Sequence, residues 1–125
     1  MKAQHVTECE LLVMKTIWSH PEKDMALPEI LGLVNSTYGK EWAPQTVSTF
    51  LKRLVNRGFL RVYRQGRSFF YHELISFTDY REATIFDACD FWFDGDAAAL
   101  VEALHKAKTL TSDDKAKIQK LLKNI

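Results

Sequence analysis

Residues 44–73, PQTVSTFLKRLVNRGFLRVYRQGRSFFYHE, are the stretch of this 125-residue sequence that decides its fold. Apolar side chains recur in its first half at three- and four-residue intervals, which places them on one face of a helix. These side chains are Val47, Phe50, Leu51, Leu54 and Val55. Proline suits the first turn of a helix and glycine suits its end, so we expect a helix that starts at Pro44 and stops at Gly58.

The second half of this stretch has the composition of two strands. Residues 59–64 and 67–74 are rich in β-branched and aromatic side chains, and Gln65-Gly66 between them is typical of a turn. The sequence therefore predicts a β-hairpin directly after the helix.

Two further helices are expected upstream. Thr7 and Glu10 have the T-x-x-E spacing of a capping box, which starts a first helix that ends at Pro21. Pro28 suits the first turn of a second helix, and residues 35–39 are the break after it. Three helices followed by a hairpin is the order of a winged helix-turn-helix domain, in which the hairpin is the wing.

The charge distribution separates the chain into two parts. Residues 1–75 carry ten Lys and Arg against seven Asp and Glu, whereas residues 76–125 carry seven against nine. The basic part is the candidate nucleic-acid-binding part. We expect a mainly α-helical (α+β) protein with a winged-helix DNA-binding domain over residues 1–75 and a helical dimerisation domain over residues 76–125.

Polar side chains opposite the apolar stripe of the third helix are the candidate DNA-reading groups. Short or forked polar groups near the start of such a helix reach base edges in the major groove, and cations meet phosphates. From Pro44 to His72 the chain has six cations and no Asp or Glu. Arg64 and Arg67 flank the predicted turn, where they are expected to contact the DNA backbone or a minor groove. The candidate DNA-binding residues are Gln45, Thr46, Ser48, Thr49, Lys52, Arg53, Arg64 and Arg67.

A solvated surface is the alternative interpretation of this segment. Polar residues lie opposite the apolar stripe of most surface helices, so the third helix taken alone favours that alternative. The coincidence of an acid-free basic segment with the third helix and the hairpin favours DNA binding. The alternative function is a winged helix that docks a protein partner without binding DNA.

Aromatic residues crowd the stretch 77–93, which carries more apolar surface than one exposed helix can bury. We expect these rings to pack against the same segment of a second chain rather than fold back on the winged helix, which has apolar stripes of its own. Apolar faces of two later helices continue this surface. The candidate dimerisation residues are Phe77, Tyr80, Phe86, Phe91, Trp92, Phe93, Leu100, Leu104, Ile118, Leu121 and Leu122.

The motifs of enzymes, metal sites and cofactor sites are absent from the sequence. Cys9 and Cys89 lie far apart and the histidines are scattered singly, so neither a zinc site nor a disulfide framework is indicated. No glycine-rich phosphate loop or nucleophile motif occurs. No signal-peptide run and no stretch of about 18 apolar residues occurs, so we expect a cytoplasmic protein without a membrane segment.

Several runs of the chain resemble the penicillinase-repressor (BlaI/MecI/CopY) family. These runs are ELLVMKTIW at 10–18, WAPQTVSTFLKRL at 42–54, RG at 57–58, GRSFFY at 66–71, LV at 100–101 and LT at 110–111. The resemblance implies a homodimeric winged-helix repressor that sits on dyad operators, often with TACA/TGTA half-sites. Members commonly control β-lactam resistance or copper handling, so the resemblance points to genes of resistance to β-lactams or another stress. The positions that it matches to DNA reading are Gln45, Thr46, Ser48, Thr49 and Arg53.

The chain departs from the family pattern at several positions. Ala43 stands where the family usually has Ser, which removes a helix cap worth about 1 kcal/mol. Gln45 and Ser48 are uncharged where the β-lactam repressors tend to be basic. In that branch a membrane sensor protease triggers cleavage of an Asn-Phe bond, and the aligned pair here is Ala103-Leu104. The cysteine-rich metal hook of the copper branch is absent.

Overall fold

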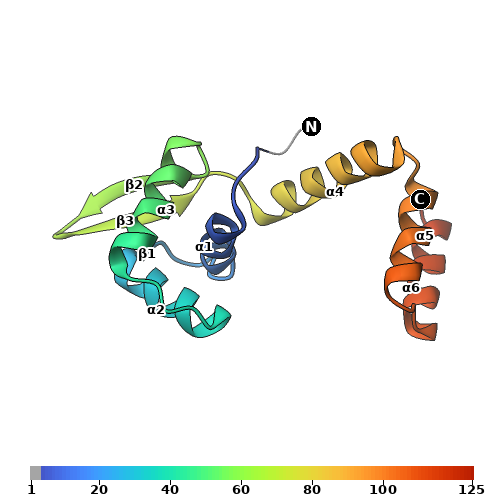
Figure 1. The fold of residues 1–125 in the computed structure, drawn as a ribbon, viewed down its shortest axis with the longest axis horizontal. Helices are drawn as coiled ribbons and strands as arrows, with labels where there is room; N and C mark the ends of the chain where they lie inside the picture. Colours follow the sequence, from blue (N-terminus) through green and yellow to red (C-terminus); the bar gives the residue numbers. More distant parts are fainter. Residues whose placement is uncertain (1–3) are drawn as a thin grey trace. The chain divides into compact units, whose positions relative to one another are not determined.

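The computed structural model describes residues 4–125, which form a mainly helical fold with one small antiparallel sheet (Figure 1). The predicted fold class is therefore confirmed. In chain order the elements are α1 (Glu8–Trp18), β1 (Met25–Ala26), α2 (Leu27–Tyr38), α3 (Pro44–Asn56), β2 (Leu60–Gln65), β3 (Ser68–Glu73), α4 (Phe77–Phe93), α5 (Ala97–Ala107) and α6 (Ser112–Lys123).

Local sequence signals set the ends of the first and third helices, as predicted. The backbone N–H of Glu10 donates to Thr7 Oγ1 at 3.2 Å, and the backbone N–H of Thr7 donates to Glu10 Oε1 at 2.8 Å. This reciprocal pair is the predicted capping box, and it starts α1. Helix α3 starts at Pro44, and Gly58 after its end takes a φ of 81°, a left-handed conformation that suits glycine.

The predicted hairpin is present as β2 and β3, but its turn lies one residue later than expected. Gln65 pairs with Ser68, so the turn residues are Gly66 and Arg67 rather than Gln65-Gly66. Gly66 has a φ of 66° at the first turn position, where a two-residue hairpin loop favours glycine. Figure 1 shows the tip of this hairpin projecting past helices α1 to α3.

A third strand, β1, was not predicted from the sequence. Met25 pairs with Tyr71 and Ala26 with Phe70, so the sheet has the order β1-β3-β2 and all its pairings are antiparallel. Two residues are too short to show the alternation of polar and apolar side chains that identifies a strand. The partner strand, distant in sequence, is what makes β1 a strand.

One hydrophobic core joins α1, α2, α3 and the sheet. The apolar stripe predicted for α3 faces this core, with three of its five residues fully buried and Phe50 and Val55 packed at its edge. Each fully buried side chain of this kind contributes roughly 1.5–3 kcal/mol relative to an exposed one. The largest fully buried apolar side chains are Val13, Met14, Met25, Ile30, Val34, Val47, Leu51, Leu54, Phe59 and Leu60.

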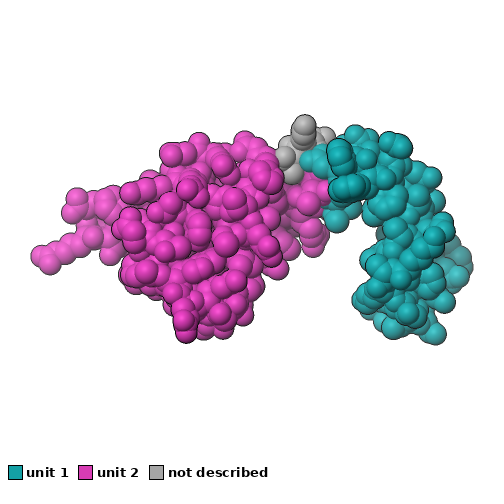
Figure 2. All heavy atoms as spheres, in the orientation of Figure 1, with its two compact units in different colours: residues 1, 85–125 teal, residues 2–84 magenta. Residues whose placement is uncertain are grey.

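The chain divides into two compact units inside α4 (Figure 2). The winged-helix unit, drawn in magenta in Figure 2, ends at Thr84 and is called the first unit in the text, although the figure's key numbers it 2. The helical unit, drawn in teal and numbered 1 in the key, runs from Ile85 to Ile125 and is called the second unit. Residues 77–84, the first part of α4, therefore belong with the winged helix, whereas the sequence analysis divided the chain after residue 75.

The second unit consists of the rest of α4 with α5 and α6. Its helices have regular starts: Asp96 Oδ1 accepts from the backbone N–H of Ala99 at 3.0 Å, and Thr111 and Asp114 form a capping box. None of its residues, 85–125, is buried. The second unit thus has well-formed helices without a core of its own.

Candidate nucleic-acid interface

The accessible side of α3 carries all the helix residues that the sequence analysis assigned to DNA. Every one of them keeps accessible surface, whereas Val47, Leu51 and Leu54 are fully buried. Gln45, Lys52 and Arg53 are exposed, and Thr46, Ser48 and Thr49 are half-buried. The hydroxyl of Thr49 donates to the backbone oxygen of Gln45 at 3.1 Å, which leaves the lone pairs of its oxygen able to accept a hydrogen bond.

The turn between α2 and α3 is fixed by side-chain contacts. Asn35 Nδ2 donates to the backbone oxygen of Trp42 at 3.0 Å, and the backbone N–H of Trp42 donates to Asn35 Oδ1 at 3.1 Å. The Trp42 ring meets the Phe50 ring edge-on with centroids 5.1 Å apart. These contacts hold the start of α3 against α2 in a helix-turn-helix arrangement.

The first turn of α3 offers positive potential to an anion. Its N-cap residue, Ala43, makes no side-chain hydrogen bond to the helix, and no acidic residue lies in the first turn. Backbone N–H groups at a helix start are suited to phosphate oxygens when no side chain occupies them.

The two wing arginines lie at the tip of the hairpin. Arg67 is a turn residue, and Arg64 is the last but one residue of β2. Arg64 Nε donates to the backbone oxygen of Gly66 at 3.0 Å, and its guanidinium lies 5.9 Å from the centre of the Phe69 ring. Within residues 4–125, no carboxylate forms an ion pair with Lys52, Arg53, Arg64 or Arg67. Their charges are available to a polyanion.

A groove of about 220 Å³ lies between α3 and the inner side of the hairpin. Its lining includes two polar groups that the sequence analysis missed, Asn56 and Tyr71, beside Lys52. Burial raises the pKa of Tyr71. Its phenol hydroxyl can donate a hydrogen bond. Sequence spacing gave no signal for this groove, because it joins residues from three elements.

Asp24, the residue before β1, contacts two polar side chains of the hairpin. Tyr63 Oη donates to Asp24 Oδ2 at 2.6 Å, and His72 Nδ1 lies 2.9 Å from Asp24 Oδ1. Burial raises the pKa of Asp24, but the hydrogen bonds from Tyr63 and His72 and the charges of His72 and Arg61 outweigh it, so the pKa is lowered. These contacts tie the base of the hairpin to the residue before β1.

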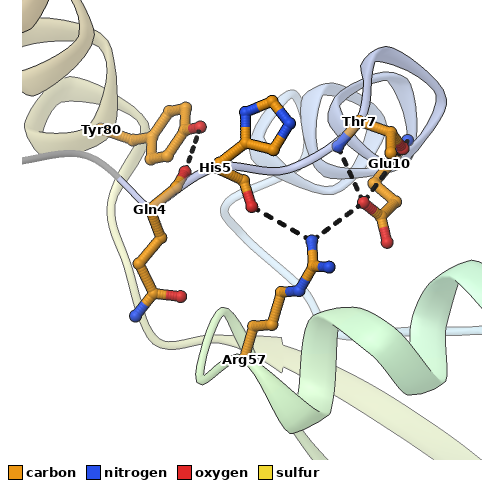
Figure 3. Close-up of polar contacts among 6 residues, drawn as sticks. All are labelled: Gln4, His5, Thr7, Glu10, Arg57 and Tyr80. Atoms are coloured by element: carbon orange, nitrogen blue, oxygen red, sulfur yellow. Dashed lines mark hydrogen bonds and ion pairs between the residues drawn. The ribbon is translucent and has the colours of Figure 1, made fainter.

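Arg57 belongs to the acid-free basic segment, yet it serves the fold. Its Nη1 donates to Glu10 Oε1 at 3.3 Å and to the backbone oxygen of His5 at 3.1 Å (Figure 3). Glu10 is fully buried, and although burial raises its pKa, the hydrogen bonds from Thr7 and the charges of Arg57 and Arg53 hold that pKa below its ordinary value. The signal for this pair was an acid in the apolar stripe of the first helix, with no partner nearby in sequence.

The family model described as "Penicillinase repressor" matches residues 6–124 of the chain. The chain belongs to this family. The resemblance found in the sequence runs is thus confirmed. The chain is 30% identical to the penicillinase repressor of Bacillus licheniformis over 100 residues. This match covers 80% of the chain and 75% of that relative. It is 23% identical over 121 residues to the methicillin resistance regulatory protein MecI of Staphylococcus aureus, with coverages of 97% and 95%.

Two solved structures of this penicillinase repressor family are similar to the chain. The DNA-binding domain of the repressor BlaI shares 34% identity with a TM-score of 0.52, over 64% of this chain and 94% of that one. Bacillus licheniformis BlaI, a monomeric form in complex with the blaP half-operator, shares 34% identity with a TM-score of 0.51, over 63% and 92%. The similarity covers about the share of the chain that forms the winged helix, and it supports that fold.

Two of the rings assigned to dimerisation, Phe77 and Tyr80, contact the winged helix, whereas the sequence analysis expected these rings not to fold back on it. The Phe77 ring lies 5.5 Å from the Trp18 ring, and the Tyr80 ring lies 5.7 Å from Trp18 and 5.4 Å from Phe59. Tyr80 Oη also donates to the backbone oxygen of Gln4 at 3.0 Å. The fold-back occurs because Trp18 and Phe59 reach the edge of the core, where the first part of α4 covers them.

The other assigned dimerisation residues lie in the second unit and keep much of their surface. Phe91 and Trp92 are 74% and 73% exposed, and their rings meet edge-on at 4.7 Å. Phe86, Leu104, Leu121 and Leu122 are also exposed, and Phe93, Leu100 and Ile118 are half-buried. Ile85, Val101 and Ile125 are further exposed apolar residues of this unit that were not assigned. The second unit therefore exposes many apolar side chains, and large exposed apolar patches are typical of interaction surfaces.

In the part of the chain that the structure describes, no helix is both long and apolar enough to cross a bilayer. In the same residues, no group of three His, Cys, Asp or Glu side chains is placed to hold a metal ion.

Proposed function

We propose that this protein represses transcription by binding operator DNA in a sequence-specific manner through α3 and the wing. The observation that carries the proposal is the joint exposure of α3 polar groups and wing arginines, with no ion pair to a carboxylate within residues 4–125. Helix α3 enters the major groove, and Arg64 and Arg67 contact the backbone or an adjacent minor groove. The similarity to BlaI bound to a half-operator supports this assignment.

We propose that the protein acts as a homodimer on a dyad operator, with the second unit as the dimerisation module. Helices α5 and α6 carry apolar side chains, and residues 85–125 include none that is buried. A second copy of the same helices covers such surface most simply, because like chains present self-complementary patches. In a dimer, two copies of α3 face half-sites about one helical turn of DNA apart.

The genes under control are those of resistance to β-lactams or another stress, as the family implies, and a cytoplasmic location follows because an operator-binding repressor works at the chromosome. A repressor of this kind needs no enzymatic activity and no cofactor. A sensor protease is the further partner that the family implies. The aligned bond, Ala103-Leu104, lies within α5, so cleavage there requires the helix to open first.

The test is the salt dependence of binding to duplex DNA, measured by fluorescence anisotropy. Each phosphate contact adds about 0.9 to the slope of log affinity against log salt concentration. Replacing both Arg64 and Arg67 with Ala should lower the slope by about 2 and weaken binding to all sequences alike. A matched control, Lys15→Ala with Lys106→Ala, removes the same charge from α1 and α5 and should leave the slope unchanged. Equal slopes in all three proteins contradict the assignment of Arg64 and Arg67 to DNA contacts. If the affinity of the wild type does not depend on salt concentration, the protein-docking alternative is favoured.

A further inference from the structure

The segment of residues 4–7 contacts both the end of α3 and the first part of α4. Arg57, the C-cap residue of α3, donates to the backbone oxygen of His5 at 3.1 Å. Tyr80, in the first part of α4, donates to the backbone oxygen of Gln4 at 3.0 Å. Figure 3 shows these two side chains approaching the segment from different elements. One short stretch of backbone therefore links α3, the proposed DNA-reading helix, with α4.

The segment itself is held firmly. The Val6 side chain is 5% exposed and belongs to the core. The backbone N–H and the hydroxyl of Thr7 both donate to Glu10 Oε1, at 2.8 and 3.0 Å, and Arg57 reaches the same oxygen. Because Glu10 is fully buried, this carboxylate fixes the segment and the end of α3 to the start of α1.

The first part of α4 has two kinds of attachment to the winged helix. The Tyr80 ring packs on Trp18 and Phe59, and Trp18 Nε1 donates to the backbone oxygen of Ile75, just before α4. Burial of the ring surface is non-directional, so most of its contribution survives a small rotation of the helix. The hydrogen bond from Tyr80 to Gln4 is directional and is lost when the helix rotates.

We propose that residues 4–7 with Arg57 and Tyr80, the N-terminal clamp, hold the base of α4 in one position and thereby restrict the spacing of half-sites that a dimer accepts. This inference rests on the proposed operator binding. Helix α4 runs from Phe77 to Phe93 and spans the boundary between the two units, so a change at its base can be transmitted to the second unit. When the spacing between half-sites differs from the preferred one, the dimer can bind both only if the N-terminal clamp opens in one protomer. The clamp residues act on DNA through α4 and are positioning residues.

The test compares Tyr80→Phe with the wild type on duplexes of altered spacing. The reference duplex is the dyad that the wild type selects from a random-sequence pool, and the others have one base pair added to or removed from the spacer. The wild type should discriminate against the altered duplexes. Discrimination is the ratio of the affinity for the reference duplex to the affinity for an altered one. Loss of the Tyr80 hydroxyl should reduce this ratio about fivefold, the equivalent of one hydrogen bond, while affinity for a single half-site stays unchanged.

Tyr63→Phe is the matched control, because it removes a tyrosine hydroxyl bonded to Asp24 in the same unit, away from α4. Its spacing discrimination should equal that of the wild type. The inference is overturned when Tyr80→Phe keeps full discrimination, or when both variants lose it equally. Selection of no duplex by the wild type contradicts the proposed function instead, so the two failures are distinguishable.

Discussion

Replacing Glu10 with Gln is expected to destabilise the first unit by about 2 kcal/mol near neutral pH. The Glu10 Oε1 atom accepts from Thr7 N at 2.8 Å, from Thr7 Oγ1 at 3.0 Å and from Arg57 Nη1 at 3.3 Å. A hydrogen bond to a charged group contributes roughly 1.5–3 kcal/mol and a neutral one about 1 kcal/mol, so removing the charge weakens all three. Breaking a fully buried ion pair costs about 3–5 kcal/mol, but the Arg57 side chain is 42% exposed and can turn to water, which limits the loss.

The loss of unfolding free energy caused by Glu10→Gln should become smaller as pH falls. Because the pKa of Glu10 is lowered in the folded protein, the ionised carboxylate stabilises the fold. This contribution is complete above the ordinary pKa of the carboxyl and is lost as pH falls through the lower folded pKa. The difference in unfolding free energy between wild type and Glu10→Gln should therefore be constant from about pH 7 to 6 and shrink toward about pH 3.

Urea-induced unfolding, followed by tryptophan fluorescence, measures this difference at equal chain concentrations. Glu8→Gln is the matched control, because Glu8 lies in the same first turn of α1 and is exposed. We expect the control to change the unfolding free energy by less than about 0.5 kcal/mol. The reasoning is refuted when Glu10→Gln costs no more than Glu8→Gln, or when its cost is the same in acid.

Further predictions concern the core, the second unit and base recognition. Leu51→Ala, at a fully buried position of α3, should lower the unfolding free energy by about 3 kcal/mol in urea, and a loss below about 1 kcal/mol contradicts the packing described. Phe91→Ser with Trp92→Ser should shift sedimentation toward the single chain while leaving the unfolding midpoint of the first unit in place; unchanged sedimentation removes these rings from the interface. Gln45→Ala and Thr49→Ala should each change the bases selected from a random pool, and unchanged selection excludes them from base reading.

Helix ends were predictable from the sequence because the residues that set them are close together along the chain. Thr7 and Glu10 cap α1 with contacts across three residues, and Pro44 starts α3 through its own ring geometry. The accessible face of α3 also followed from helical spacing alone, since the apolar stripe leaves the opposite face to water.

The features that were missed depend on contacts between distant residues. Strand β1 exists through its pairing with β3, and the Arg57–Glu10 pair joins the end of α3 to the start of α1. The fold-back of Tyr80 onto Trp18 was also invisible, because spacing shows that a helix has an apolar face but not which surface covers it. For the same reason, composition grouped Arg57 with the cations of the DNA face, although its guanidinium is engaged by a buried carboxylate.

Backbone amide chemical shifts recorded during titration with the selected duplex test the central claim most directly. Changes should concentrate in residues 45–56 and in the hairpin around Gly66, the surface formed by α3 and the wing. Shifts confined to residues 85–125, or spread over α1 with none in α3, would contradict DNA recognition by this surface.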